Sequence, residues 1–276
     1  MPLPTDFQFS QSSLQDYFDC PRRFELRYIL KQKWPAIQTE PVVEFEHHME
    51  IGTRFHRLVH QHILGIPDDV LEAGITDPHL MKWWQVFHQY APLKDLPLPH
   101  LPEYRLAAVF EGHRLVAQYD LLSLDAGKTA VIMDWKTSAR RPTSGNLQQR
   151  IQSRLYPLLL MLAGERLNNG SPFEPEQIEM RYWFPGAPDK PEVINYTKDR
   201  YNEDRVFLSS LINEIKNTPD GRFLLTADER KCKFCEYRSL CERQVKADDW
   251  KEIDDSDLIL QNDTTLDIEQ IGDIIF

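Results

Sequence analysis

The N-terminal third of the chain carries apolar side chains at helical spacing. Leu14, Phe24 and Tyr28 lie on one stripe of a segment whose start Ser10 can cap. A later apolar pattern stops before Gly65, a residue type that favours the end of a helix. These patterns predict three helices, over residues 10–30, about 43–64 and 80–90.

Beyond a proline-dense connector over residues 92–102, the pattern changes to short runs rich in β-branched and aromatic residues. Turn signals at Glu111-Gly112 and Asp125-Ala126-Gly127 separate the first three runs, as in an antiparallel meander. The pattern predicts strands over residues 104–110, 114–124, 129–135 and 178–184, and helices over residues 147–163 and 200–216. This order predicts an α/β core in which one sheet is flanked by helices.

The chain of 276 residues is long enough for one large domain or for a domain with an appendage. We expect residues 1–247 to form one domain and residues 248–276 to form an acidic C-terminal tail. The tail holds ten carboxylates against one lysine, which accounts for most of the net charge of −11. The body is therefore nearly neutral with local basic runs, and this balance neither supports nor excludes a nucleic acid as ligand.

Two interpretations of the acidic tail remain open. Carboxylates mixed with isolated apolar residues are typical of a mobile, solubilising tail. The regular apolar residues, among them Leu258, Ile268 and Ile275, also fit a segment that docks on a partner or covers a basic groove as a mimic of DNA.

The four cysteines of the chain are Cys20, Cys232, Cys235 and Cys241. No apolar run is long enough to cross a bilayer, and no basic segment followed by an apolar one begins the chain, so we expect a cytoplasmic protein without membrane association. In that compartment the cysteine spacing favours a metal or a cluster over disulfides. Four thiolates suit either Zn²⁺ or an iron–sulfur cluster, and spacing alone does not separate the two.

Three charged residues lie near the ends of two neighbouring predicted strands. Asp120 comes late in the second strand, while Asp134 and Lys136 come at the end of the third. Residues two apart on a strand face the same side, so Asp134 and Lys136 project together, and pairing through the turn at Ala126 would bring Asp120 close. Two carboxylates suit Mg²⁺ or Mn²⁺, and the lysine can position water or offset charge on a phosphoryl transition state. An isolated Asp-x-Lys is more often a surface ion pair, so the assignment of a catalytic site depends on the other motifs of the chain.

Four motifs, in order along most of the chain, give the sequence a resemblance to the RecB-like branch of the PD-(D/E)XK nuclease superfamily. They are Gly52-Thr53-Arg54-Phe55-His56, Asp120, Asp134-Trp135-Lys136 and Gln152-Ser153-Arg154-Leu155-Tyr156. They resemble the family's helical histidine motif, first catalytic aspartate, (D/E)XK element and Gln-x-x-x-Tyr motif. The sequence departs from the family before Asp120, where Ala117-Gln118-Tyr119 stands in place of the usual glycine-containing segment. Glu103 falls near the position of a further acidic residue of the family.

The cysteines extend this resemblance. A distant Cys20 followed by a C-terminal C-x₂-C-x₅-C triplet is the arrangement of the AddB-like iron–sulfur members and of the stand-alone nucleases of CRISPR adaptation. The resemblance implies a [4Fe–4S] cluster that clamps Cys20 to the segment 232–241. It also implies a helical part over residues 10–90 and a restriction-endonuclease-like core with a mixed sheet over about residues 100–200.

The resemblance further implies a Mg²⁺- or Mn²⁺-dependent deoxyribonuclease, an exonuclease acting on single-stranded DNA or DNA ends in recombination, repair or CRISPR-linked processing. The metal ligands it implies are His56, Asp120, Asp134 and the backbone carbonyl of Trp135. Lys136 would position or activate the attacking water, Gln152 would orient the lysine or the scissile phosphate, and Tyr156 would stack on a base or donate to phosphate. No P-loop is present, so unwinding would need a helicase partner, and a CRISPR-adaptation protein is another candidate partner.

Several basic residues are candidates for contact with DNA. Arg150 and Arg154 are four apart on a predicted helix and either contact DNA or belong to a solvated helix face. Arg22, Arg23 and Arg27 follow Cys20 and could line a path for a single strand.

Three rival interpretations remain. The histidine-rich helix, with pairs such as His56 and His60, has the spacing of a separate metal site. A catalytically inactive scaffold that binds DNA ends would keep the same fold, although the intact Asp120, Asp134 and Lys136 argue against it. A ferredoxin-like electron carrier fits poorly, because the chain has only four cysteines and one of them is remote.

Overall fold

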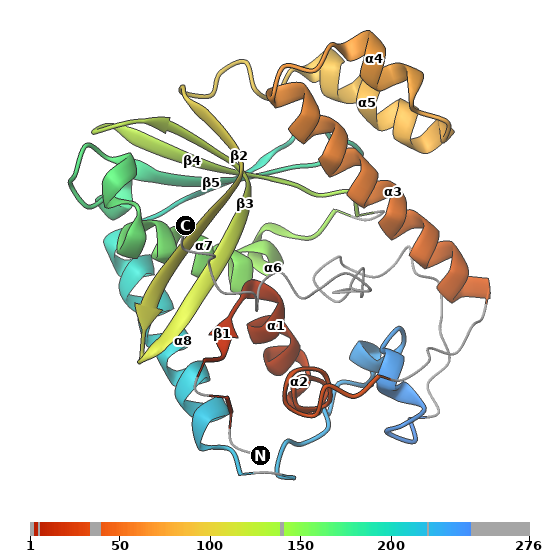
Figure 1. Cartoon of the computed structure of the whole chain (residues 1–276), viewed down its shortest axis with the longest axis vertical. Helices are drawn as coiled ribbons and strands as arrows, with labels where there is room; N and C mark the ends of the chain where they lie inside the picture. The colour runs from red at the N-terminus through yellow and green to blue at the C-terminus, as the bar shows by residue number, and fades with distance from the viewer. Residues whose placement is uncertain (1–2, 5, 34–39, 139–140, 220, 244–276) are drawn as a thin grey trace.

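A six-stranded mixed sheet forms the centre of the computed structural model, which describes residues 3–4, 6–33, 40–138, 141–219 and 221–243 (Figure 1). The strands are β1 (Gln8–Phe9), β2 (His100–Phe110), β3 (His113–Asp125), β4 (Thr129–Trp135), β5 (Ile178–Trp183) and β6 (Glu192–Asn195). β2, β3 and β4 form the predicted antiparallel meander. β1 pairs parallel with β3 and β5 pairs parallel with β4, which confirms a mixed sheet flanked by helices.

Helices cover both faces of the sheet (Figure 1). They are α1 (Gln11–Asp19), α2 (Pro21–Phe24), α3 (Glu40–Ile63), α4 (Asp68–Ala73), α5 (Pro78–Tyr90), α6 (Ser144–Gln149), α7 (Ile151–Ala163) and α8 (Lys198–Asn217), with a π-helical turn over Glu25–Ile29. α3, α5, α7 and α8 confirm four of the predicted helices to within a few residues at each end. The strand β1, the strand β6 and the short helix α4 were not predicted, because each is too short to show a clear period.

Two predicted helices are each broken once. The prediction of one helix over residues 10–30 is wrong, because Cys20 is extended, with φ −159° and ψ 102°, between α1 and α2. Pro21 explains the break, since its ring disfavours a helical conformation at the preceding residue. The helix predicted over residues 147–163 breaks at Arg150, which is also extended and joins α6 to α7.

The two faces of the sheet bury separate apolar clusters. On one face, α1, α7 and α8 pack against the sheet through residues such as Leu14, Leu155 and Ile212. On the other face, α3 and α5 pack against it through Phe55, Trp84 and other apolar residues. The sheet is therefore the middle of three layers, and burial of both faces is expected to supply most of the stability.

The two ends of the described chain meet beside α1. The Tyr17 hydroxyl donates to Glu214 at 2.9 Å, the Arg22 amide donates to the Leu224 carbonyl at 3.1 Å, and the Tyr237 hydroxyl donates to the Gln32 carbonyl at 2.9 Å. These contacts bring Cys20 and the C-terminal cysteines into one region. The acidic tail over residues 248–276 lies outside the described residues. Within the described part of the chain, none of the helices is long and apolar enough to cross a membrane.

Candidate active site

The two predicted catalytic aspartates lie where β3 and β4 stop pairing. The antiparallel ladder runs from Asp125 opposite Thr129 to Leu121 opposite Met133. Asp120 and Asp134 hold the next opposing positions, as pairing through the turn at Ala126 predicts. Asp120 Oδ2 accepts a hydrogen bond of 2.9 Å from the Trp135 amide. The aspartate side chain thus takes the place of the backbone acceptor that a continued ladder would supply.

An irregularity in β2 and β3 decides where Asp120 can reach. Glu103 lies across from Asp120 and has a left-handed backbone, with φ 50°, which is uncommon for a residue with a side chain. Leu121 belongs to the cluster under α3, whereas Tyr119 belongs to the cluster under α7. Residues two apart would share a face on a regular strand, so the strand changes face at Asp120. This change lets the Asp120 carboxylate reach α3 while it remains beside β4.

Glu103 itself is part of the acidic end of the sheet. Its carboxylate accepts a hydrogen bond from the Gln118 amide group, and Gln118 in turn accepts one of 2.7 Å from Arg105. Burial raises the pKa of Glu103, and the nearby Asp120 carboxylate raises it further. The loosely assigned acidic position of the motif pattern is therefore near the site.

His56 approaches the aspartates from α3. Its Nδ1 lies 3.3 Å from Asp120 Oδ2. Burial alone would lower the pKa of His56, but the carboxylates of Asp120 and Asp134 more than offset it and raise the pKa to about 9. Burial would likewise raise the pKa of Asp120, but the charge and hydrogen bond of His56 hold it below its usual value. The imidazole of His56 thus favours the ionised form of Asp120.

A close contact of α3 with the end of β4 explains the glycine of the helical motif. A Cβ atom built on Gly52 would lie 2.6 Å from Thr137 Oγ1. One turn earlier on the helix, His48 Nε2 is 2.8 Å from the Thr137 carbonyl oxygen. Neither His48 nor Thr137 was predicted as part of the site, because nothing in the local sequence shows that the two segments touch. The contact positions His56 relative to Asp134 and Lys136.

Asp134, Lys136 and Gln152 form one hydrogen-bonded network. Lys136 Nζ lies 2.9 Å from Asp134 Oδ2 and donates to Gln152 Oε1 at 2.9 Å, and Gln152 Nε2 donates to Asp134 Oδ1. Burial raises the pKa of Asp134, which the Lys136 ammonium opposes and the Asp120 carboxylate reinforces. Gln152 thus touches both the predicted metal ligand and the predicted catalytic lysine.

Tyr156 and Trp135 are buried beside this network. Tyr156 is 7% exposed and its ring packs 4.9 Å from that of Tyr119, whose hydroxyl donates to the Tyr156 carbonyl. The Trp135 side chain, 2% exposed, packs with Phe87 and Trp183 in the cluster under α3. Both side chains therefore contribute packing that fixes the backbone around the charged residues.

The donor set suits a hard divalent cation. Two carboxylates and an imidazole lie in one region, and Asp134 Oδ2 is buried with no hydrogen-bond donor among the described residues besides the adjacent Lys136 ammonium. The ligand atoms of His56, Asp120 and Asp134 do not all lie within 4.8 Å of one another. Asp134 contacts Lys136 and Gln152, whereas Asp120 contacts His56.

The arginines considered for DNA contact are largely engaged inside the protein. Arg154 lies 2.7 Å from Asp204 and stacks over Phe207, and Arg150 is only 6% exposed. Arg23 pairs with Asp16 and Asp19, and Arg27 pairs with Asp16 and Glu236. The expectation that they form a solvated face or an open path for DNA is therefore wrong for Arg23, Arg27, Arg150 and Arg154, because three of them form internal ion pairs and Arg150 is buried.

The four cysteines gather between the N- and C-terminal segments. All four are free thiols, and Cys20 interacts electrostatically with Cys232, Cys235 and Cys241. Burial raises the pKa of each of these three, to about 11 for Cys235. The nearby cations that oppose this effect and favour thiolates are Arg22, Arg23, Arg27 and Arg243. Four free thiols, of which Cys20 and Cys232 are buried, with arginines around them fit an anionic thiolate-ligated metal centre.

Comparison with known proteins gives a match to one family model and to solved structures. A profile described as the PD-(D/E)XK nuclease superfamily matches residues 8–242. The solved structure called "Crystal structure of SSO0001" aligns over 85% of each chain, with 13% identity and a TM-score of 0.40. A protein of Eubacterium rectale named "Putative exonuclease" aligns over 82% of this chain and 85% of its own, with 11% identity and a TM-score of 0.46. At these identities and TM-scores neither structure bears on the activity of this chain, and no curated protein matches.

Proposed function

The chain belongs to the PD-(D/E)XK nuclease superfamily, and from this premise we propose that it is a Mg²⁺- or Mn²⁺-dependent deoxyribonuclease that degrades single-stranded DNA or DNA ends as an exonuclease. Nucleases of this superfamily typically depend on divalent metal ions. One observation carries the proposal: Asp120 and Asp134 hold opposing positions at the end of a strand pair, and Lys136 lies 2.9 Å from Asp134. Exonucleolytic action is proposed from the resemblance of the ordered motifs.

The proposed roles follow from the contacts. His56, Asp120, Asp134 and the Trp135 carbonyl would hold the cation, which would stabilise the charge that develops on the scissile phosphate. Lys136 would then be released from Asp134 to hold the attacking water or a phosphate oxygen. Gln152 would keep the lysine in place through the bond already present, at 2.9 Å. Tyr156, which is buried, would support this geometry through its packing on Tyr119.

We also propose that Cys20, Cys232, Cys235 and Cys241 hold a [4Fe–4S] cluster. The support is the meeting of four thiols from both ends of the domain and the arginines that favour their ionised form. The cluster would act as a structural clamp rather than as an electron carrier, because its ligands would join the N-terminal segment at Cys20 to the C-terminal segment 232–241. These two parts of the chain also contact each other through Arg22 with Leu224 and through Gln32 with Tyr237. Recombination, repair or CRISPR-linked processing, with a helicase or an adaptation protein as partner, remains the proposed context.

The direct test is degradation of labelled DNA by the full-length, anaerobically purified protein. Linear single strands labelled at either end and a circular single strand, each with Mg²⁺ or Mn²⁺, report activity and distinguish attack at ends from internal cleavage. Asp134→Asn removes a metal ligand with little change of shape, so we expect the rate to fall at least about a hundredfold. Asp125→Asn is the matched control, since that carboxylate ends the same strand pair at the surface and pairs with Lys128.

Two outcomes would contradict the proposal. An Asp134→Asn protein that degrades DNA as fast as the parent would show that this carboxylate is not catalytic. A parent that binds DNA ends but leaves them intact with either cation would favour the inactive scaffold instead.

A further inference from the structure

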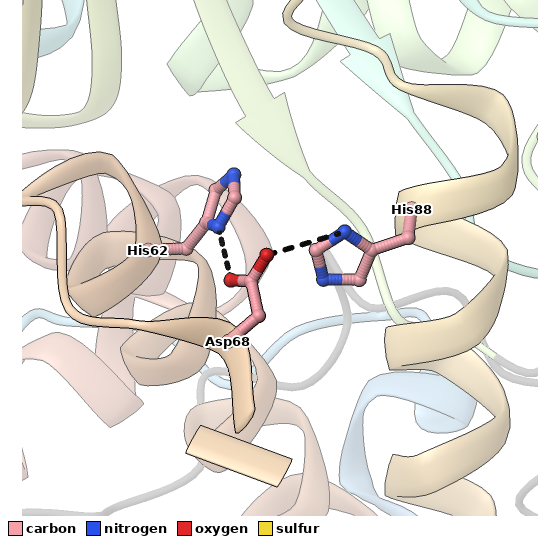
Figure 2. Close-up of side chains that lie close together, drawn as sticks. All are labelled: His62, Asp68 and His88. Carbon is pink, nitrogen blue, oxygen red and sulfur yellow. Dashed lines mark hydrogen bonds and ion pairs between the residues drawn. The ribbon is translucent and has the colours of Figure 1, made fainter. Parts of the chain in front are cut away.

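A second group of possible metal ligands lies away from the proposed catalytic residues. His62 near the end of α3, Asp68 at the start of α4 and His88 near the end of α5 each offer one ligand atom, and these atoms all lie within 4.8 Å of one another. In Figure 2 the two imidazole rings lie on either side of the Asp68 carboxylate. Both rings present Nδ1 to it, His62 at 2.6 Å and His88 at 3.9 Å.

We propose that His62, Asp68 and His88 bind one Zn²⁺ ion. Two imidazoles and one carboxylate are a donor set that zinc accepts, with a water in the fourth position. Ligands bound at about 2.0–2.1 Å in a tetrahedral site stand roughly 3.3 Å apart. The observed separations of 2.6 and 3.9 Å lie on either side of that value, so small side-chain rotations would complete the site.

The surroundings hold the two rings in place but leave the site open to solvent. His88 packs edge-on against the buried Trp84, with ring centroids 4.3 Å apart, and His62 packs against Trp84 and Phe87 at 5.8 and 5.6 Å. The ligand side chains are 29%, 45% and 33% exposed for His62, Asp68 and His88, so an ion can enter without local unfolding. Among the described residues nothing accepts a hydrogen bond from His88 Nε2, and the missing outer partner predicts moderate rather than extreme affinity.

A bound ion would fasten three helices that the chain joins only by short connections. α3 packs on both α4 and α5, and α4 and α5 lie beside the C-terminal end of α3 (Figure 1). His56, on the same helix, lies less than two turns before His62. The ion would therefore stiffen the helical layer that carries His56, without contact with the proposed catalytic residues.

The test is a Zn²⁺ titration of the full-length protein with its iron content measured and with excess Mg²⁺ present. Iron, where present, would occupy the proposed cysteine site, and Mg²⁺ would compete at the proposed carboxylate site. Mg²⁺ would not compete at the two histidines, because it binds imidazole poorly. We expect the parent and His79→Gln, an exposed histidine on the same helix as His88, to bind one Zn²⁺ more than His62→Gln/His88→Gln. Zn²⁺ should also raise the unfolding temperature of the first two proteins only.

Asp68→Asn serves as a second variant, because the substitution lies at the surface and keeps the side-chain shape. It should weaken Zn²⁺ binding at least about tenfold. Loss of an outer-shell partner weakens metal affinity by about tenfold or more, and loss of a direct ligand should weaken it at least as much. Equal Zn²⁺ stoichiometry and affinity in Asp68→Asn and in the parent would overturn the proposal and leave a simple His62–Asp68 hydrogen bond. This result is independent of nuclease activity, so the two proposals can fail separately.

Discussion

The carboxylate site and the cysteine region differ in the elements that support them. The carboxylate site stands on two paired strands and two long helices, and His56 and Lys136 already balance its aspartates at 3.3 and 2.9 Å. The three C-terminal cysteines lie instead on or beside short 3₁₀ turns over Glu229–Cys232 and Glu236–Arg238. Neutral thiols, which the raised pKa values favour, form no strong bond with one another.

This difference predicts two kinds of dependence on metal. Regular elements with internally paired charges should keep their geometry without an ion, so metal binding at the carboxylates serves chemistry. A segment without regular elements gains much of its order from its ligands, so metal binding at the cysteines serves folding. Variants of both regions test this contrast.

The largest expected effect comes from Cys235→Ser. We expect loss of most of the bound iron and an unfolding temperature lower by at least about 5 °C, given roughly 2–4 °C per kcal/mol for a chain of this size. Residues 221–243 should become sensitive to limited proteolysis while the strands stay protected. Iron and zinc analysis, thermal unfolding and proteolysis measure these changes.

Two controls accompany that experiment. Asp125→Asn should retain both the iron and the unfolding temperature, and removal of Mg²⁺ from the parent should shift the unfolding temperature less than Cys235→Ser does. A Cys235→Ser protein with normal stability would show that the cysteines do not clamp the two segments together. A parent that holds zinc in place of iron would show that the site is a zinc site and not an iron–sulfur cluster.

An intermediate effect is expected for pH on cation binding at the carboxylate site. Because the pKa of His56 is raised to about 9, a metal ion must displace a proton from it over the neutral range. Mn²⁺ affinity should therefore rise with pH by up to about tenfold per unit between pH 6.5 and 8.5. The ion pair with Asp120 stabilises the metal-free fold fully below pH 6.5, and this contribution is lost as pH rises through about 9.

Mn²⁺ titrations followed by electron paramagnetic resonance at several pH values test this slope. His56→Gln should bind more weakly and with a flatter pH dependence. His60→Gln, one turn further along the same helix, should keep the parent slope. An unchanged slope in His56→Gln would show that another group releases the proton.

The smallest effect is expected at the contact of α3 with the end of β4. A glycine-to-alanine change inside a helix normally adds about 1 kcal/mol of stability. The added methyl group of Gly52→Ala would meet Thr137 Oγ1 at 2.6 Å, so we expect no gain, or a loss of about 1 kcal/mol. Thr137→Ala removes that atom, and the double variant should recover the gain. Denaturant unfolding of the four proteins of this cycle gives the coupling, and additive effects would show that the contact is not tight.

Much of the fold could be predicted from the sequence because local periodicity reports which face of an element is buried. The three-strand meander and the long helices α3, α5, α7 and α8 follow from such patterns. The single helix predicted over residues 10–30 failed at Cys20, because the apolar stripe continues through Pro21 although the backbone does not. Spacing also placed Asp134 with Lys136 and Gln152 with Tyr156, since neighbours on one face of a strand or helix are a property of the chain itself.

Contacts between elements remote in sequence could not be predicted, because they depend on how the folded elements pack. The change of face at Asp120, the approach of Gly52 to Thr137 and the grouping of His62 with Asp68 and His88 depend on register and packing that no local period encodes. The same holds for Arg23 and Arg154, whose carboxylate partners lie on other turns or helices. The order of residues along the chain was enough to assign each candidate residue to an element and to one face of that element. Only packing decided which charges meet, because an ion pair forms where the folded chain brings opposite charges together.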